Sequence, residues 1–561
     1  MKATIIHPTL GSTIGQQAII DTSKSLRSFA VAAPLTARRY RLHVLLICGS
    51  TGFWSVLLGP DNNWDLRFYH LYAPWAYLNG RYLYDVGPAQ YQGFFNPTAD
   101  LLFYALTSSI LNETPRIVAF IMGAVHGINV VLILAIALHV LAPRQFGERF
   151  ALRTVALVMG ASGAGFVSLL GTTTNDLLNS IFVLGSLLGL LKVADQASKR
   201  GVWFDFAWSG LLVGIGVGLK YTVVIFIPGL CLIAVIAAVR RKTASGLIAF
   251  GVAVMLGFSA AAGHHLLTLW QDFENPVFPL FNHIFQSAYY EPVSLRDEQF
   301  LPRGIWQTIA YPFYWMKTNR DVVSELTFRD WRGAIAYVAI AGGLLTLAAA
   351  RARKMHRADG TFTETRCLGL VFIFVAASYL VWELGFSIYR YAVALEMLTG
   401  IVTIGALIRL LRDHRLRIVI AIVLLAIVVT TTIHFDWGRG QYGDRYVDVR
   451  VPQLPANSVV LIATWDPAAY FIPFAEPTAQ YLGIENNYLK LSQHNKLASK
   501  VNSLMRAPGR PKFVLSVGEF DSAKLNKLLK HFDLQLGTSP CQPIHSNLEV
   551  EALSLCPVAP E

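Results

Sequence analysis

Charged residues are scarce in this chain of 561 residues. Asp, Glu, Lys and Arg together make up 15% of it, whereas soluble proteins average about 25%. Hydrophobic residues make up 54%, and apolar runs that are long enough to cross a membrane recur along most of the length. This composition excludes an ordinary soluble protein and predicts an all-α polytopic membrane protein.

An acidic surplus is also lacking, because the net charge is +12. The Lys and Arg residues lie in short loops between apolar runs, as they do on the cytoplasmic side of membrane proteins. A cleavable signal peptide is missing too, since residues 1–37 contain no short apolar core followed by a cleavage site. We therefore expect no nucleic-acid partner, and a cytoplasmic tail over residues 1–41.

Cysteine is rare, with five residues in the chain. Cys48, Cys231 and Cys367 fall in apolar runs and are expected to be inert, small apolar residues. Cys541 and Cys556 both lie near the C-terminus, which the topology below places in an oxidising compartment, where a disulfide is permitted. A metal-binding pair is the alternative for them, but no His or Cys lies nearby at ligand spacing.

The basic loops predict the topology. The sequence ARRYR (37–41) precedes the first apolar run and places the N-terminus in the cytoplasm. Every later basic loop falls on that same side if the chain crosses the membrane about eleven times, which leaves the C-terminus outside. The predicted spans are 42–59, 116–141, 152–170, 177–193, 204–219, 222–239, 245–268, 333–350, 367–383, 391–408 and 416–434.

The predicted membrane domain covers residues 42–435 and has two long periplasmic loops, 60–115 and 270–332. In the first loop, the apolar piece 101–111 is too short to cross a core of about 30 Å, so we expect two or three interfacial helices there. Residues 436–561 change character. Short strand patterns such as SVVLIA and KFVLSV, with one amphipathic helix, predict a small periplasmic α/β domain.

Ionisable residues gather at the predicted outer ends of the spans, and their cost at membrane depth indicates a functional site. Asp65 is favoured because Asp65, Tyr69 and Tyr72 lie at i, i+4 and i+7 of one helix face. Each other residue also has a structural alternative. These are a cap or turn for Asp61, Asp85 and Asp100, a structural histidine for His70, extension to the surface for Lys220, an interface anchor for Arg390, and a local ion-pair set for Arg329, Asp330 and Arg332.

The sequence DLRFYHLYAPWAYLNGRYLYD, followed by NPTADLLFYAL, resembles the first outer loop of the GT-C superfamily of polytopic glycosyltransferases. Protein O-mannosyltransferases and lipid A aminoarabinose transferases belong to that superfamily. Its acidic residue, Tyr, glycine turn and His-Pro-Pro-like helix start are matched here by Asp65, Tyr69, Asn79–Gly80 and Asn96–Pro97. Two positions depart from the pattern: Leu66 replaces the second acidic residue of the usual pair, and Asn96 replaces the common His.

The resemblance implies transfer of a sugar from a polyprenyl-phosphate carrier to an acceptor hydroxyl, with inversion at the anomeric carbon. Such a transfer needs a base, which a carboxylate can supply, and cations beside the leaving phosphate. We therefore expect Asp65 to be the catalytic base, with Asp61 as the second candidate, and Lys220 and Arg390 to contact the phosphate. The remaining predicted substrate-binding residues are Tyr69, His70, Arg81, Asp85, Asn96, Asp100, Asp176, Tyr221 and Glu274.

The sequence thus predicts a hexosyl- or pentosyltransferase of the bacterial inner membrane. Its expected partners are the bilayer, a polyprenyl-phosphate-linked donor and an envelope acceptor, which would be a glycolipid, a polysaccharide or a protein, at the periplasmic face. A divalent cation is compatible with this chemistry but is not indicated, because the acidic pair is incomplete. Two alternatives stay open: an enzyme similar to O-antigen polymerases or ligases, and a transporter or flippase of lipid-linked sugars. A transporter would favour broken helices in matching halves, which the sequence lacks.

Overall fold

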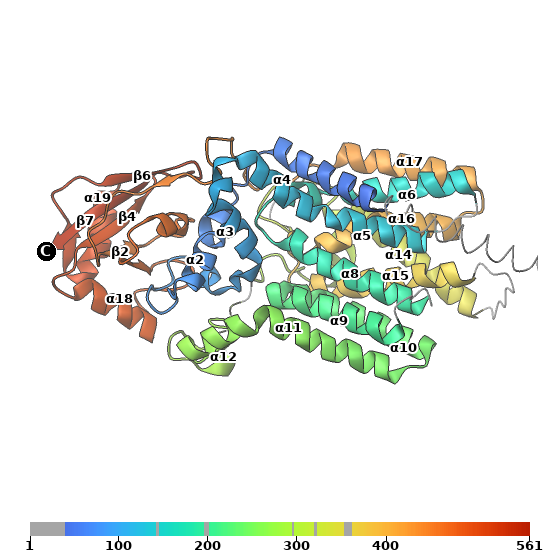
Figure 1. Ribbon diagram of the computed structural model, residues 1–561, viewed down its shortest axis with the longest axis horizontal. Coiled ribbons are helices and arrows are strands. Elements are labelled where there is room, and N and C mark those ends of the chain that lie inside the picture. Colours follow the sequence, from blue (N-terminus) through green and yellow to red (C-terminus); the bar gives the residue numbers. More distant parts are fainter. Residues whose placement is uncertain are drawn as a thin grey trace, which may run out of the picture.

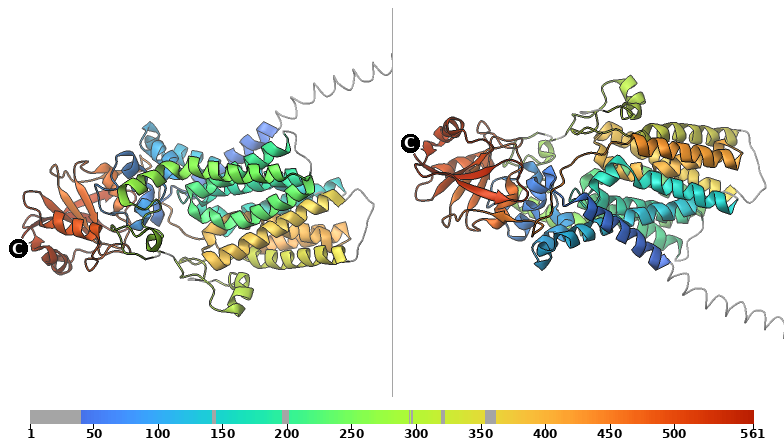
Figure 2. Two further views of the ribbon diagram at one scale, coloured as in Figure 1. Left: turned by 90° about the horizontal axis from the view of Figure 1, so that it is seen from below. Right: turned by 90° about the horizontal axis from the view of Figure 1, so that it is seen from above.

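Three parts make up the protein: a bundle of long helices, a C-terminal domain built on a β-sheet, and short helices that lie between them (Figure 1). Two further views show the bundle and the C-terminal domain at opposite ends of the molecule (Figure 2). The predicted tail, residues 1–41, lies outside the described residues except for its last two. This computed structural model describes residues 40–141, 145–195, 201–293, 295, 297–318, 322–352 and 362–561.

Nine helices of the described residues are long and apolar enough to cross a membrane. They cover Tyr40–Leu58, Pro115–Val140, Asp176–Ala194, Val202–Leu219, Tyr221–Arg241, Ala244–Phe273, Cys367–Gly385, Tyr389–Leu410 and His414–Thr431. The helices labelled in Figure 1 within these spans are α4 (Pro115–His126), α5 (Ile128–Val140), α8 (Asp176–Ala194), α9 (Val202–Leu219), α10 (Ile227–Arg241), α11 (Ala244–Phe273), α15 (Phe362–Gly385), α16 (Val393–Leu410) and α17 (His414–Thr431).

Two of the eleven predicted spans are not among these nine. The predicted span 152–170 is divided, because α6 (Phe146–Ala161) ends before Gly163 and the short helix α7 (Ala164–Leu169) begins after it. The predicted span 333–350 falls on α14 (Arg332–Ala352), in which the described side chains cover an apolar stretch, Arg332–Thr346, of fewer than 18 residues. Both α6 and α14 pack against α16, whose residues are nearly all buried at the centre of the bundle. A count of eleven spans therefore stays a prediction.

The first loop, residues 60–115, contains no span, as predicted. It folds into short helices that lie between the bundle and the C-terminal domain (Figure 1). Its aromatic residues share a hydrophobic core with that domain, in which Phe94 packs edge-on against Phe278 with ring centroids 5.1 Å apart. The elements are the π-helical turn η1 (Leu66–His70), α2 (Tyr72–Leu78), α3 (Leu101–Thr107), and the 3-10 turns η2 (Tyr91–Phe94), η3 (Pro97–Asp100) and η4 (Ile110–Glu113).

The second long loop, residues 270–332, also reaches the C-terminal domain. Tyr290 stacks on Tyr488 with ring centroids 4.6 Å apart. The Asn282 side-chain amide donates to the carbonyl oxygens of Ser287 and Tyr290, at 3.0 and 2.8 Å, and so fixes the turn that presents Tyr290. The helices of this loop are α12 (Asn282–Phe285) and α13 (Ile305–Tyr314), and the 3-10 turn η6 (Tyr389–Ala392) opens the later span at α16.

The C-terminal domain is a seven-stranded mixed sheet with helices beside it, which agrees with the predicted α/β domain. The strand order is β1-β6-β7-β4-β2-β3, with β5 paired to β7, and β2 runs parallel to both β3 and β4. Asp521 caps α19 by accepting a hydrogen bond from the Lys524 amide at 2.9 Å. The elements are β1 (Val449–Arg450), β2 (Val459–Ile462), η7 (Ala469–Phe474), β3 (Gln480–Gly483), α18 (Lys496–Arg506), β4 (Lys512–Val517), α19 (Ser522–Leu529), η8 (Lys530–Phe532), β5 (Leu534–Leu536), β6 (Gln542–Ser546) and β7 (Leu553–Pro560).

Cys541 and Cys556, the predicted pair, are joined by a disulfide between the segments that form β6 and β7. The bond closes a loop with a sequence separation of 15 residues. In the chain-entropy model such a loop contributes about 3 kcal/mol of stability. Mass spectrometry without a reductant should find the two cysteines in one cross-linked peptide, and the Cys541→Ser, Cys556→Ala double variant should unfold more easily. Two free thiols in protein from an oxidising compartment would contradict this prediction.

The topology is testable on exposed positions at the two ends of the bundle. Asn79 in the first loop and Ser522 in the C-terminal domain are exposed, whereas Ser245 is exposed at the opposite end. Single Cys replacements at Asn79 and Ser522 should react with an impermeant maleimide in intact spheroplasts. Cys at Ser245 should react only after permeabilisation. Labelling of Asn79→Cys or Ser522→Cys only after permeabilisation would reverse the predicted orientation.

Candidate active site

Segments that are far apart in sequence meet where the bundle joins the first loop. Asp65 precedes η1, and Arg390 lies in η6, and their side chains form a direct ion pair. The side chain of Asp65 is 15% exposed and that of Arg390 is 20% exposed, so solvent can still reach the pair. The π-helical turn that follows Asp65 is a form found frequently at functional sites.

Arg390 is held among aromatic rings. Its guanidinium carbon lies 5.5 Å from the ring centre of Tyr391 and 5.6 Å from that of Trp437, both within range of a cation–π interaction. Among the hydrogen bonds of the described residues, Arg390 makes only the one to Asp65. The other N–H groups of its guanidinium therefore remain free to bind an anion.

A second cation lies beside the same ring. The ammonium nitrogen of Lys220 lies 5.2 Å from the ring centre of Tyr391, donates to Asp176 Oδ1 at 2.6 Å and donates to the Thr174 carbonyl at 2.9 Å. The other carboxylate oxygen of Asp176 is buried and has no hydrogen-bond partner among the described residues. Asp176 and Tyr391 also line a small cavity. Tyr391 thus has two cations, Arg390 and Lys220, within cation–π range of its ring.

A buried His–Asp pair follows Asp65 along η1. His70 Nδ1 lies 2.7 Å from Asp100 Oδ1, and the Asn175 side-chain amide donates to that same oxygen at 2.5 Å. The Tyr69 ring packs on the His70 ring at a centroid distance of 4.1 Å. His70 Nε2 is buried without a partner in the described part of the chain. The carboxylate therefore fixes the orientation of the imidazole, and the second ring nitrogen stays unpaired.

Opposing effects set the charge state of Asp65. Burial by itself raises the pKa of Asp65, but the positive charges of Arg390, His70 and Lys220 outweigh it and bring the pKa below its ordinary value of 3.8. Asp65 is therefore an ionised carboxylate at neutral pH. Burial and the neighbouring Asp65 raise the pKa of Tyr69 well above its ordinary value, so this phenol stays protonated.

Arg81 and Asp85 lie elsewhere, at the junction with the C-terminal domain. Arg81 pairs with Asp85 at 2.7 Å and also donates to the carbonyl oxygens of Pro477 and Ala479. Asp85 accepts the backbone N–H of Tyr481 at 3.0 Å. The adjacent Val86 forms a parallel bridge to Leu482, which extends the sheet beyond β3. Both are predicted substrate-binding residues, and in the structure their side chains join the first loop to the C-terminal domain.

Asp61 is fully occupied by structural hydrogen bonds. It accepts from the backbone and side chain of Asn63, and from the backbone and hydroxyl of Thr173, at 2.8 to 3.0 Å. It is 1% exposed, and its own N–H donates to the Tyr446 hydroxyl. These contacts agree with the turn interpretation of Asp61 and leave Asp65 as the stronger base candidate.

Three other predicted residues have no contact with the Asp65–Arg390 pair in the described structure. Asn96 caps η3 and donates to the carbonyl oxygens of Gly218 and Ala261, and so ties the first loop to α9 and α11. Tyr221 has a buried hydroxyl without a partner among the described residues. Glu274 is exposed and ends α11 in a left-handed conformation with φ 58°. The structure therefore gives Asn96 a structural role and leaves Glu274 at the surface.

Of the predicted ion-pair set Arg329, Asp330 and Arg332, the last two form an ion pair, whereas Arg329 donates to the carbonyl oxygen of Thr431. Arg332 donates to Asp330 at 2.8 Å and to the carbonyl oxygen of Met159 at 2.8 Å, and both charged groups are fully buried. Asp330 also accepts from the Tyr389 hydroxyl at 3.3 Å. Because Tyr389 directly precedes Arg390 in η6, its hydrogen bond to Asp330 helps to fix the backbone position of Arg390.

Asn175, Tyr391 and Trp437 were missed from the sequence. Asn175 adopts a left-handed conformation with φ 63° directly before α8, which turns its side chain to Asp100. The only available signal for Tyr391 was its place beside Arg390. Trp437 follows the last span, and nothing in the sequence indicates that its ring lies beside Arg390.

Comparison with known proteins agrees with the resemblance. Residues 99–264 match the family model of dolichyl-phosphate-mannose-protein mannosyltransferases, which confirms the predicted resemblance to the GT-C superfamily. The match includes Asp100, Asp176 and Lys220, whereas Asp65 and Arg390 lie outside it. It supports a membrane glycosyltransferase. No curated protein matches the chain.

Two solved structures align with the chain at low similarity. The oligosaccharyltransferase of Archaeoglobus fulgidus in its apo form aligns with a TM-score of 0.44 and 11% identity, over 88% of this chain and 71% of that chain. The arabinofuranosyltransferase AftD from Mycobacteria aligns with a TM-score of 0.44 and 13% identity, over 92% of this chain and 41% of that chain. At these values the likeness gives no information on the substrate.

Proposed function

We propose that the protein transfers a sugar from a polyprenyl-phosphate carrier to an acceptor hydroxyl of the cell envelope. The observation that carries this proposal is the Asp65–Arg390 pair, with Lys220 beside it, on a membrane chain that matches a mannosyltransferase family model. The reaction takes place at the outer, periplasmic face of the bacterial inner membrane. The anomeric carbon is inverted, because the acceptor attacks from the face opposite the leaving phosphate.

Each residue has a role in this scheme. Asp65, ionised at neutral pH, takes the proton of the acceptor hydroxyl while the acceptor oxygen bonds to the anomeric carbon. The bond from that carbon to the phosphate oxygen breaks, and Arg390 and Lys220 stabilise the negative charge that forms there. Arg390 is pre-positioned because its ion pair with Asp65 and the two aromatic rings fix its guanidinium. The hydrogen-bonded His70 and Asp100 hold η1 in place.

A lipid carrier needs an apolar path to this place. An apolar groove lies on the side of the bundle between the first helix and α5 to α7, and is lined by residues such as Trp54 and Phe166. One wall of the groove, α7, packs close to Tyr389, next to Arg390, because a Cβ added at Gly165 would meet the Tyr389 ring at 3.3 Å. The chain from Leu170 at the groove to Asp176 at the Lys220 pair is six residues long. This arrangement supports a prenyl chain in the groove and its phosphate beside the two cations.

Product analysis tests the proposal. Membranes with and without the protein receive radiolabelled polyprenyl-phosphate sugars, and glycosylated acceptors are then separated from unreacted donor. Transfer that depends on the protein supports the enzyme. Movement of the intact donor across the bilayer without a new glycosidic bond would favour the transporter or flippase instead. A requirement for a diphosphate-linked oligosaccharide as donor would favour the polymerase or ligase class.

A further inference from the structure

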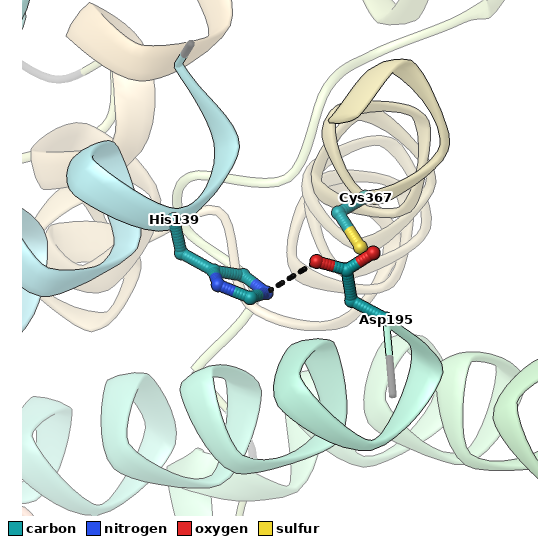
Figure 3. A group of neighbouring side chains, drawn as sticks. All are labelled: His139, Asp195 and Cys367. Atoms are coloured by element: carbon teal, nitrogen blue, oxygen red, sulfur yellow. Dashed lines mark ion pairs between the residues drawn. The ribbon is translucent and has the colours of Figure 1, made fainter. Parts of the chain in front are cut away.

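Three side chains that commonly bind metals meet at the end of the bundle that lies far from the C-terminal domain (Figure 3). His139 is at the end of α5, Asp195 directly follows α8, and Cys367 is in the first turns of α15. The three helices pack against one another. One ligand atom from each residue lies within 4.8 Å of the other two. Figure 3 shows the carboxylate of Asp195 between the imidazole and the sulfur.

The imidazole and the carboxylate are too far apart for a direct hydrogen bond, but their spacing suits two ligands of a shared ion. His139 Nε2 lies 3.6 Å from Asp195 Oδ2. In a tetrahedral zinc site, nitrogen and oxygen ligands with bonds of about 2.0–2.1 Å lie roughly 3.4 Å apart. The thiol of Cys367 makes a weak contact of 3.8 Å with the carbonyl oxygen of Leu191 and also interacts with the Asp195 side chain. A metal ion fits between these groups with shifts of about an ångström or less.

Unpaired polar atoms give independent support. His139 Nε2 and Asp195 Oδ1 are both buried and have no hydrogen-bond partner among the described residues. Buried polar atoms in native proteins are nearly always partnered, and an exception is often explained by a bound ion or water. Cys367 is 1% exposed, so the third residue of the cluster is also shielded from solvent. The ion pair between His139 Nε2 and Asp195 Oδ2, at 3.6 Å, is too long for a hydrogen bond and does not involve Asp195 Oδ1.

We propose that His139, Asp195 and Cys367 bind one zinc ion, with water as the fourth ligand. Imidazole, carboxylate and thiolate are the ligands of zinc, and Cys367 loses its thiol proton to solvent when the ion binds. The predicted topology places this end of the bundle in the cytoplasm, where thiols remain reduced. The ion joins α5, α8 and α15 at a place away from the candidate active site. Cys367, expected from the sequence to be an inert apolar residue, becomes a ligand.

The metal content of the purified full-length protein tests this site independently of glycosyl transfer. After incubation with zinc and removal of loosely bound ions, wild type should retain one zinc per chain by mass spectrometry. Cys367→Ala and His139→Gln should each lower the retained zinc at least about tenfold. Cys231→Ala, which removes an exposed cysteine of α10, is the matched control and should retain the wild-type amount.

A spectroscopic measurement on wild type avoids any effect of the substitutions on folding. Cobalt in place of zinc should produce a thiolate-to-cobalt charge-transfer band and the visible absorption of a tetrahedral ion. Both features should be absent in Cys367→Ala. The proposal is overturned if wild type retains no zinc and shows no such band with cobalt, or if Cys367→Ala keeps the wild-type zinc content. Loss of zinc binding with intact glycosyl transfer leaves the proposed function standing, so the two can fail separately.

Discussion

Replacing Asp65 with Asn should lower the rate of glycosyl transfer by about 10²–10⁴, the usual cost of losing a general base. The change keeps the size and shape of the side chain and removes its negative charge and its basicity. Asp65 is ionised at neutral pH because Arg390, His70 and Lys220 outweigh the effect of burial on its pKa. The measurement is kcat/KM with a polyprenyl-phosphate sugar, in protein whose thermal unfolding is compared with wild type.

The control for this substitution is Glu274→Gln, which also removes one predicted carboxylate. Glu274 is exposed at the end of α11, so its neutralisation should leave transfer within about twofold of wild type. If Asp65→Asn keeps wild-type activity, the base lies elsewhere. Asp176 would be tested next, because one of its carboxylate oxygens is buried beside Lys220 without a partner among the described residues.

Apolar length and basic loops were enough to predict most of the bundle. All nine membrane-competent helices fall on predicted spans, and α19 and β4 fall on the predicted helix and strand of the C-terminal domain. The division of the predicted span 152–170 has a local cause, because Gly163 separates α6 from α7. One glycine hardly changes the average hydrophobicity of a window, so the apolar pattern alone did not predict the break.

The sequence indicates candidate site residues only where a charged side chain lies next to an apolar run, because a charge at membrane depth is costly in free energy. Asp65, Lys220 and Arg390 are charged residues at the ends of apolar runs. In the structure Arg390 pairs with Asp65, and Arg390 and Lys220 both lie beside the Tyr391 ring. Arg81 and Asp85 have the same local appearance. Their partners, however, are backbone atoms almost 400 positions later, around Ala479 and Tyr481. A single sequence does not indicate which charged residues have such distant partners.

Arg390→Gln should lower kcat/KM by about 10²–10³, the usual cost of removing one donor that stabilises developing negative charge. Arg390→Lys should recover part of this loss, because an ammonium keeps the charge but lacks the planar fork that binds a phosphate at two points. Asp65→Asn combined with Arg390→Gln should cost less than the product of the single losses, since the two side chains form one ion pair. Strict additivity would mean that Arg390 acts independently of Asp65.

The pH profile distinguishes this role from a purely structural one. In wild type the acid limb of kcat/KM should lie below the ordinary carboxylate value of 3.8, because the pKa of Asp65 is lowered in the folded protein. Any stability from the ion pair is likewise present above that value and is lost as the pH falls through the lowered pKa. Arg390 makes the largest contribution to lowering the pKa of Asp65 against burial, so Arg390→Gln should move the acid limb to higher pH, and Arg390→Lys should move it back. An acid limb at the same pH in all three proteins would show that Asp65 is not the base that Arg390 controls.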